Sequence, residues 1–230
     1  MTSQLGPIGF FSSTPSAQAG VLLAELIGDF EGSVLALPTG AAYEGPDLAV
    51  AQIESLLGPL GVLIEPVMVL KRTDAERADL AELVRSARCI CLSGASPLHM
   101  RSVLKDSTVF AALRAAWHEG AVVIGFDAGA VVLCDPMVDP RGGAFTVGLG
   151  LVRDVSVVTA TTGGHSASLE RTVALAPNEC AVVAVGIDGG IVRDQSGVWL
   201  CEGDVTIYSA GVEVELSELA GKPMSENSAG

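Results

Sequence analysis

The stretch Ile124-Gly125-Phe126-Asp127-Ala128-Gly129-Ala130 decides the fold of this 230-residue chain. An unbroken apolar run over residues 121–125 leads into it and predicts a buried strand. Two glycines flank Asp127, and an alanine- and valine-rich stretch follows, which predicts a sharp turn into a helix. This layout is typical of a nucleophile elbow, which lifts its central side chain above the sheet at the start of the next helix.

The region before the elbow alternates β-type runs with helical periodicity. Predicted strands cover residues 8–12, 33–37, 62–70, 89–92 and 121–125, with a turn at 38–40. Predicted helices cover residues 17–27, 47–57, 73–87 and 107–118, with caps at Asp47 and Thr73. Such alternation predicts an α/β fold with three layers, in which helices cover both faces of a mainly parallel, flavodoxin-like sheet.

After about residue 150 the pattern changes to closely spaced strands. They are predicted at 155–160, 180–186, 191–193, 198–201 and 205–208. Turn signals at Asp188-Gly189-Gly190 and Glu202-Gly203-Asp204 favour antiparallel strands that complete the edge of the sheet. We expect one domain over residues 1–221 and a frayed tail over 222–230, because that tail is small and polar.

The charge balance argues against several classes of partner. The chain has 27 acidic and 13 basic residues, a formal net charge of −14, which repels nucleic acids and anionic membranes. With 49% hydrophobic residues, it can bury a core without disulfides or metals. We therefore expect neither nucleic-acid nor membrane binding.

The five cysteines predict buried thiols in a reducing compartment. Cys89 and Cys91 lie on the same face of a predicted strand, no CxxC pair occurs, and no histidine cluster accompanies the cysteines. No signal peptide and no apolar run of membrane-spanning length is visible. We expect a cytoplasmic protein with no metal and no cofactor.

Read locally, Asp127 also fits a plain helix N-cap, for which aspartate is among the preferred residues. His165, in the segment Thr161-Thr162-Gly163-Gly164-His165-Ser166, fits a loop or capping histidine equally well. A wider comparison bears on both positions.

Several short motifs, in a suitable order and spacing, resemble the serine peptidase family that includes dipeptidase E and cyanophycinase. These motifs are Val34-Leu35-Ala36-Leu37-Pro38-Thr39, Gly94-Ala95-Ser96-Pro97, Gly125 to Ala130 (G-T-S-A-G-A in the family), Gly148-Leu149-Gly150-Leu151, His165 with Arg171 and Leu175, and Gly186-Ile187-Asp188. The resemblance spans about residues 34–192 and implies a fold similar to class I glutamine amidotransferases.

The resemblance implies roles for the residues at the matching positions. Asp127 stands in place of the nucleophilic serine, and His165 stands at the general base. The backbone N–H groups of Ala95 and Ala128, beside Gly94, stand at the oxyanion hole. Carboxylates that could orient His165 are Asp135, Asp139 and Asp188, each of which also fits a turn or cap role.

Four positions depart from the family pattern. Asp127 replaces the serine, and Ala95 replaces the second glycine of a Gly-Gly pair. Gly163 stands where an acid usually precedes the histidine by two residues, and Gly189 replaces the glutamate after Asp188. The glycines that bear the fold match better than the side chains that bear the chemistry.

An aspartate cannot do the work of the serine by the same route. Attack of a carboxylate on an amide would give an anhydride, which is less stable than the amide, whereas serine gives an ester. Our leading hypothesis is a peptidase-like protein without serine peptidase activity, whose pocket binds a small molecule or short peptide. The alternative is an active hydrolase that uses Asp127 as nucleophile or base with His165. A weaker third hypothesis is an interaction subunit, such as a homodimer.

Overall fold

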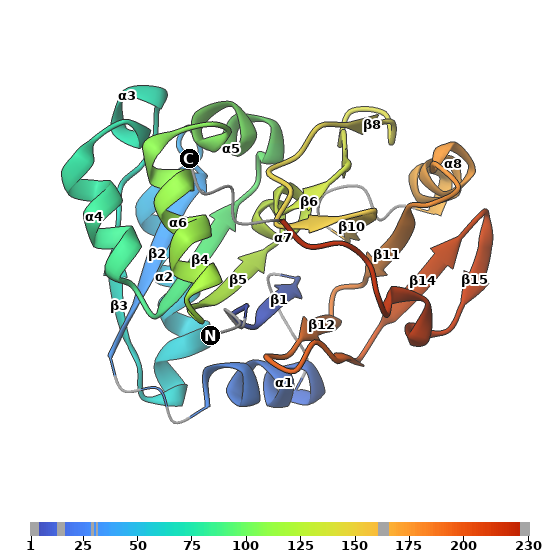
Figure 1. The fold of residues 1–230 in the computed structure, drawn as a ribbon, viewed down its shortest axis with the longest axis horizontal. Coiled ribbons are helices and arrows are strands. Elements are labelled where there is room, and N and C mark those ends of the chain that lie inside the picture. The colour runs from blue at the N-terminus through green and yellow to red at the C-terminus, as the bar shows by residue number, and fades with distance from the viewer. Residues whose placement is uncertain (1–4, 13–16, 29, 31, 161–165, 226–230) are drawn as a thin grey trace.

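The computed structural model describes residues 5–12, 17–28, 30, 32–160 and 166–225. Its main sheet contains seven strands, five of them parallel neighbours and two added antiparallel at one edge. In spatial order the strands are β13 (Trp199–Glu202), β12 (Gly190–Arg193), β1 (Ile8–Phe11), β5 (Val122–Phe126), β4 (Cys89–Gly94), β2 (Ser33–Gly40) and β3 (Leu63–Pro66). The predicted α/β fold is confirmed, with the elbow strand β5 near the centre of the sheet (Figure 1).

Helices cover both faces of this sheet. The helices in the first 132 residues are α1 (Ala17–Ile27), α2 (Pro46–Leu57), α3 (Arg72–Ala75), α4 (Ala78–Ser86), α5 (Pro97–Leu104), α6 (Thr108–His118) and α7 (Ala128–Val132), with a 3-10 turn at Gly58–Leu60. On one face, α1 and α2 pack with strand residues such as Cys89, Cys91 and Phe126. On the other, α4, α5, α6 and α7 pack on Ile90, Leu92 and their neighbours. The alternation of β4 therefore sends Cys89 and Cys91 to one face, as predicted.

The C-terminal part corrects the predicted single sheet. Of the described C-terminal strands, β12 and β13 extend the main sheet and six others form a second, mixed sheet, which Figure 1 shows beside the first in yellow to red, while β7 (Met137–Val138) and β8 (Phe145–Thr146) pair with each other. In spatial order the second sheet contains β15 (Val212–Val214), β14 (Val205–Ser209), β11 (Ala181–Val185), β10 (Val155–Thr159), β6 (Cys134–Asp135) and β9 (Val152–Arg153). The remaining elements are α8 (Ser166–Leu175) and a 3-10 turn at Leu216–Leu219. β10 and β11 are parallel, because α8 lies between them in the chain.

Several predicted boundaries were wrong. β2 continues through the predicted turn at 38–40, with a register shift between Leu37 and Gly40. The predicted helix 73–87 is two helices, separated at Arg77, whose backbone is extended (φ −73°, ψ 124°). The Asp74 carboxylate accepts the N–H groups of Leu70 and Lys71, and α3 begins at Arg72, before the predicted start. α2 begins at Pro46, after Gly45, so Asp47 lies in its first turn instead of capping it.

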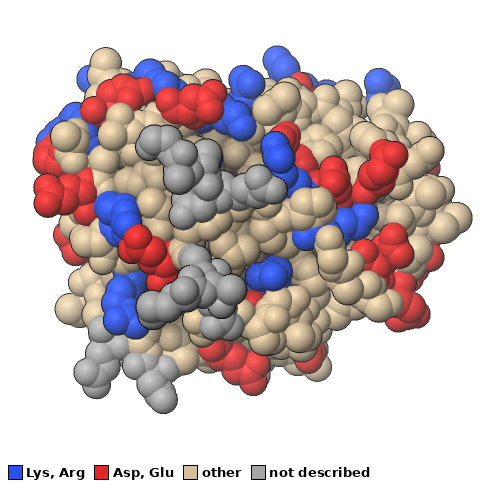
Figure 2. All heavy atoms as spheres, in the orientation of Figure 1, with Lys and Arg blue, Asp and Glu red and all other residues tan. Residues whose placement is uncertain are grey.

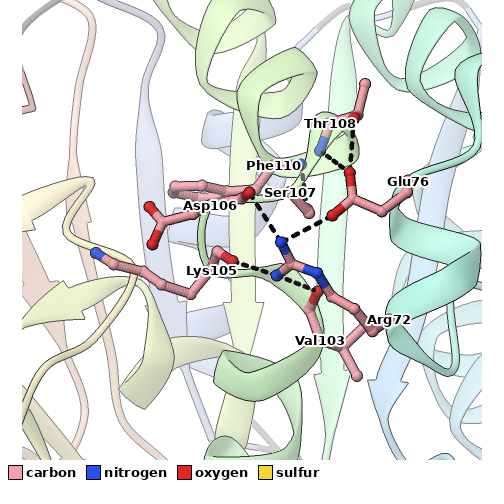
Figure 3. Close-up of polar contacts among 8 residues, drawn as sticks. All are labelled: Arg72, Glu76, Val103, Lys105, Asp106, Ser107, Thr108 and Phe110. Atoms are coloured by element: carbon pink, nitrogen blue, oxygen red, sulfur yellow. Dashed lines mark hydrogen bonds and ion pairs between the residues drawn. The ribbon is translucent and has the colours of Figure 1, made fainter.

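A polar network joins α3 to the connection between α5 and α6 (Figure 3). The Arg72 guanidinium donates to the backbone carbonyls of Val103, Lys105 and Asp106, which follow or end α5. Its ion pair with Glu76 measures 2.7 Å, and Glu76 in turn accepts the N–H and hydroxyl of Thr108 at the start of α6. One arginine therefore satisfies several carbonyls at a helix end, where no helical partner is available.

The chain remains ordered beyond residue 221. Met224 forms a β-bridge with Val152, and the Ser225 N–H donates to the Leu151 carbonyl, 2.9 Å away. Residues 222–225 of the predicted tail therefore make backbone contacts with the domain, and residues 226–230 lie outside the described part.

The expectations about charge, membrane-spanning segments and cysteines can be compared with the structure. On the face that Figure 2 shows, acidic and basic side chains are mixed, and several of them lie side by side. None of the described helices is both long and apolar enough to span a bilayer. All five cysteines are free thiols, four of them buried.

Candidate functional site

The candidate site lies where the parallel strands β4 and β5 end side by side. Leu92 is in register with Gly125, so the residues that follow both strands meet at the carboxyl edge of the sheet. In open α/β sheets this edge, outside the strand ends, is where ligands bind.

The two glycines of the elbow are required by close backbone approach. A Cβ on Gly129 would lie 2.1 Å from the carbonyl oxygen of Leu92 in β4, and a Cβ on Gly125 would lie 2.6 Å from the Ala130 nitrogen. Real Cβ atoms do not approach so closely, so any side chain at either position would force the backbone apart. The G-x-D-x-G pattern therefore follows from packing around the turn.

Asp127 occupies the point of this turn in a strained conformation. Its φ of 47° and ψ of −109° lie outside the regions that residues with a Cβ normally adopt. Its N–H donates to the Phe11 carbonyl of β1, and its own carbonyl accepts from Val131 of α7. Its side chain makes no capping hydrogen bond, so the N-cap reading describes its position but not its carboxylate. α7 has only five residues, so its dipole is small.

The second turn at this edge follows β4. Gly94 has φ 127°, and a Cβ there would lie 2.2 Å from the carbonyl carbon of Gly40 at the end of β2. The N–H groups of Ala95 and Ser96 both donate to the Gly40 carbonyl, at 3.2 and 3.0 Å. The Ala95 N–H, which the resemblance places at an oxyanion hole, thus has an acceptor within the protein.

A pocket of about 320 Å³ opens between these turns and α2. Asp127 and the turn after β4 form one side of it, and α2 with the residues before it forms the other. The lining residues are Ala41, Glu44, Gly45, Leu48, Ala49, Gln52, Ile53, Leu56, Ser93, Gly94, Ala95, Phe126 and Asp127. The structure thus brings together three of the predicted site residues, Asp127, Gly94 and Ala95, while Ala128 is buried in the turn just behind them.

The candidate orienting carboxylates lie outside this pocket. Asp135 follows the other end of α7, where its Oδ1 accepts the Gly148 N–H at 3.0 Å. Asp139 pairs with Arg141 at 2.6 Å, a contact that lowers the pKa of the Asp139 carboxyl. Asp188 is exposed in the turn between β11 and β12. His165 and Gly163 lie outside the described residues.

Three polar lining residues, Ser93, Glu44 and Gln52, carry no motif in the sequence. Ser93 is the last residue but one of β4, Glu44 lies in the loop that leads into α2, and Gln52 lies on α2. A polar residue at the carboxyl end of an apolar strand was the only signal that pointed to Ser93. Glu44 had none, because its place in the pocket depends on how α2 packs.

Residues 10–153 match the model of peptidase family S51. The chain belongs to peptidase family S51. The match covers more than half of the chain and includes β4, the elbow and α7. The predicted resemblance to dipeptidase E and cyanophycinase is thereby confirmed at the level of the family. No curated protein matches the chain.

Solved structures share the fold of this S51 member. A peptidase from an acI-B1 actinobacterium is 21% identical, with a TM-score of 0.78 over 93% of this chain and 95% of that one. A protein described as a peptidase E, from Listeria monocytogenes EGD-e, is 15% identical, with a TM-score of 0.62 over 89% and 98%. At these identities the similarity concerns the fold alone.

Proposed function

We propose that this S51 member binds a small ligand or short peptide in the pocket beside Asp127 and lacks serine peptidase activity. The observation that carries the proposal is the Asp127 carboxylate at the point of the elbow, lining the pocket. In the family pattern this is the position of the nucleophilic serine, so the residue that should attack the peptide is an acid.

The chemistry of a carboxylate supports the loss of activity. Serine peptidases pass through an ester, which water cleaves, whereas an aspartate would have to form an anhydride while expelling an amine. That exchange is strongly uphill. A negative charge at the elbow would also repel the oxyanion that the mechanism must stabilise.

Two features of the surrounding backbone support the same conclusion. The Ala95 N–H already donates to the Gly40 carbonyl, so it is not preorganised for an oxyanion. At Gly189, where the family has a glutamate, a Cβ would lie 2.2 Å from the Asp204 carbonyl oxygen. An acid there would require the backbone to move.

An amidase assay against dipeptides with an acidic or N-terminal aspartyl residue tests the proposal. We expect no release of amino acid above that of Asp127→Ala, and we expect the same dipeptides or smaller ligands to raise the Tm of the unmodified protein. Turnover by the wild type that disappears in Asp127→Ala would overturn the loss of activity.

The strained backbone of Asp127 favours a second candidate function, a hydrolase with altered chemistry. Strain of this kind gathers at catalytic residues. A carboxylate can displace a good leaving group from a saturated carbon, and water activated by a base such as His165 can then cleave the ester. Single turnover in heavy-oxygen water would label Asp127 in that case. Turnover with an unlabelled aspartate rejects the nucleophilic role.

A further inference from the structure

From the groups that line the pocket beside Asp127, we infer that its ligand carries an ammonium group on a small apolar body. The inference rests on the proposed function, namely that this pocket binds a ligand, and adds the chemical class of that ligand. Charge, hydrogen bonding and shape each contribute one part of it.

The charge of the pocket is negative. Its lining contains two carboxylates, the half-buried Asp127 and the exposed Glu44 at the mouth, and no lysine, arginine or histidine among the described residues. Opposite charges attract more strongly where the site is shielded from water than on an open surface. A cation is therefore favoured, and an anion would meet like charge at both ends.

The helix that forms the other wall does not reverse this preference. The N-terminus of α2 borders the pocket, and free N–H groups there would attract anions. However, Pro46 has no N–H, and the N–H groups of Leu48 and Ala49 both donate to the Gly45 carbonyl. Asp47 adds a further negative charge in this first turn.

Ser93 supplies a buried hydrogen-bonding group without a partner. The residue is only 6% exposed, and its Oγ is buried with no hydrogen-bond partner among the residues that the structure describes. Because side chains alternate along a strand, Ser93 lies on the same face of β4 as Cys91, which packs toward α1 and α2. That is the face on which the pocket opens. A buried hydroxyl normally has a hydrogen-bond partner, so the missing partner of the Ser93 Oγ points to a ligand.

An ammonium fits this pair of groups because it has several donors and no acceptor. An ammonium can donate to a carboxylate and to a hydroxyl oxygen at the same time, which a neutral alcohol or a carboxylate cannot do, and Asp127 and Ser93 both line the pocket. Apart from the exposed Gln52, the wall that α2 and β5 contribute is largely apolar, with Ala49, Ile53, Leu56 and Phe126. A volume of about 320 Å³ is at the small end of ligand pockets. The ligand's body is therefore short and apolar.

The ammonium group could belong to a free alkylamine or to the amino terminus of a peptide. We would measure binding of leucinamide, N-acetyl-leucinamide, butylamine and butyrate to the full-length protein by calorimetry at pH 7. We expect leucinamide and butylamine to bind and N-acetyl-leucinamide and butyrate not to bind. Leucinamide binding tighter than butylamine assigns a peptide amino terminus, and the reverse order assigns a free amine.

Variants then connect binding to the named groups. Asp127→Asn removes the charge with little change of shape and should weaken leucinamide binding at least about tenfold, since a charge-assisted bond is lost. Ser93→Ala should weaken it about fivefold, the usual effect of one hydrogen bond. The matched control Asp79→Asn, on α4 away from the pocket, should bind like the wild type, and Tm values of all variants check that they fold.

The outcomes separate this inference from the proposed function. Equal binding of N-acetyl-leucinamide and leucinamide, or unchanged leucinamide binding by Asp127→Asn, overturns the ammonium inference and leaves a ligand pocket in place. If no probe binds and no dipeptide raises the Tm, the proposed function fails together with it.

Discussion

Gly129 sits where two parts of the backbone nearly touch. Its Cα faces the Leu92 carbonyl of β4, and a Cβ would lie 2.1 Å from that oxygen. The oxygen belongs to a central strand and cannot turn aside as a side chain can. Separation of β4 from α7 would disturb the sheet and the site together.

We therefore predict that Gly129→Ala lowers the free energy of unfolding by about 3 kcal/mol, as overpacking of a rigid core does. Urea unfolding followed by circular dichroism measures this change. The control is Gly20→Ala in α1, where an added Cβ meets nothing within 4 Å. It should stabilise the protein by about 0.5–1 kcal/mol, because alanine favours a helix over glycine. Equal stability of Gly129→Ala and the wild type contradicts the packing argument.

Asp127→Ser restores the nucleophile of the family without its surroundings. We predict that the turnover of aspartyl dipeptides by this variant stays within about tenfold of that of Asp127→Ala. The reason is that Gly189 has no room for an acidic side chain and the Ala95 N–H already donates to Gly40. Recovery of peptidase activity by several orders of magnitude would mean that the remaining site is intact.

At the scale of elements, Arg72 holds α3 against the end of α5. Its guanidinium serves three backbone carbonyls and pairs with Glu76 (Figure 3). We predict that Arg72→Ala lowers the free energy of unfolding by about 1 kcal/mol, a small value because the side chain is partly exposed. Hydrogen exchange of the amides around Lys105 should become faster at the same time.

Arg77→Ala is the matched control for this network. Arg77 lies close to Arg72 in the chain, but its side chain pairs with the exposed Asp79 and, within the described residues, bonds to no backbone carbonyl. Its removal should leave both the unfolding transition and the exchange near Lys105 unchanged. Equal effects of the two variants would show that Arg72 has no special role.

Comparison of sequence and structure at this scale shows where local patterns suffice. The elbow was predictable because every feature that makes it, an apolar strand, two glycines and a small-residue helix, is contiguous. The break between α3 and α4 was missed because it lies at Arg77, whose backbone is extended although arginine favours helices. Helical periodicity alone does not indicate such a break.

The second sheet was missed for a different reason. The turn at Asp188-Gly189-Gly190 favoured antiparallel strands in one sheet, yet it connects β11 in one sheet to β12 in the other. A turn signal reports a change of direction and not the partner of each strand. Ser93 was missed for a similar reason, because whether its hydroxyl has a hydrogen-bond partner depends on residues from distant parts of the chain.

At the scale of the whole molecule, the buried thiols make stability depend on alkaline pH. Burial raises the pKa of the Cys89 thiol to about 12, from an ordinary value near 9.0. Burial also places the pKa of Cys91 well above its ordinary value. Above about pH 9 the Cys89 thiol loses its proton in the unfolded chain, whereas in the folded chain it keeps the proton up to about pH 12. The free energy of unfolding therefore falls as pH rises above about 9.

We predict that Cys89→Ala makes the decline of unfolding free energy between pH 9 and 11 less steep. The reduction is at most about 1.4 kcal/mol per pH unit, the limit for a single titrating group. Denaturant unfolding at several pH values measures the slope. Cys201→Ala, at a partly exposed thiol, should change the slope less. An identical slope for Cys89→Ala and the wild type would contradict the linkage.

The strained backbone at Asp127 lowers the stability of the fold. A residue with a Cβ at φ 47° and ψ −109° costs about 1–3 kcal/mol, and glycine would remove most of that cost. We therefore expect Asp127→Gly to unfold at a higher denaturant concentration than the wild type while losing its affinity for the ligand. A strained side chain that lowers stability is typical of a functional site.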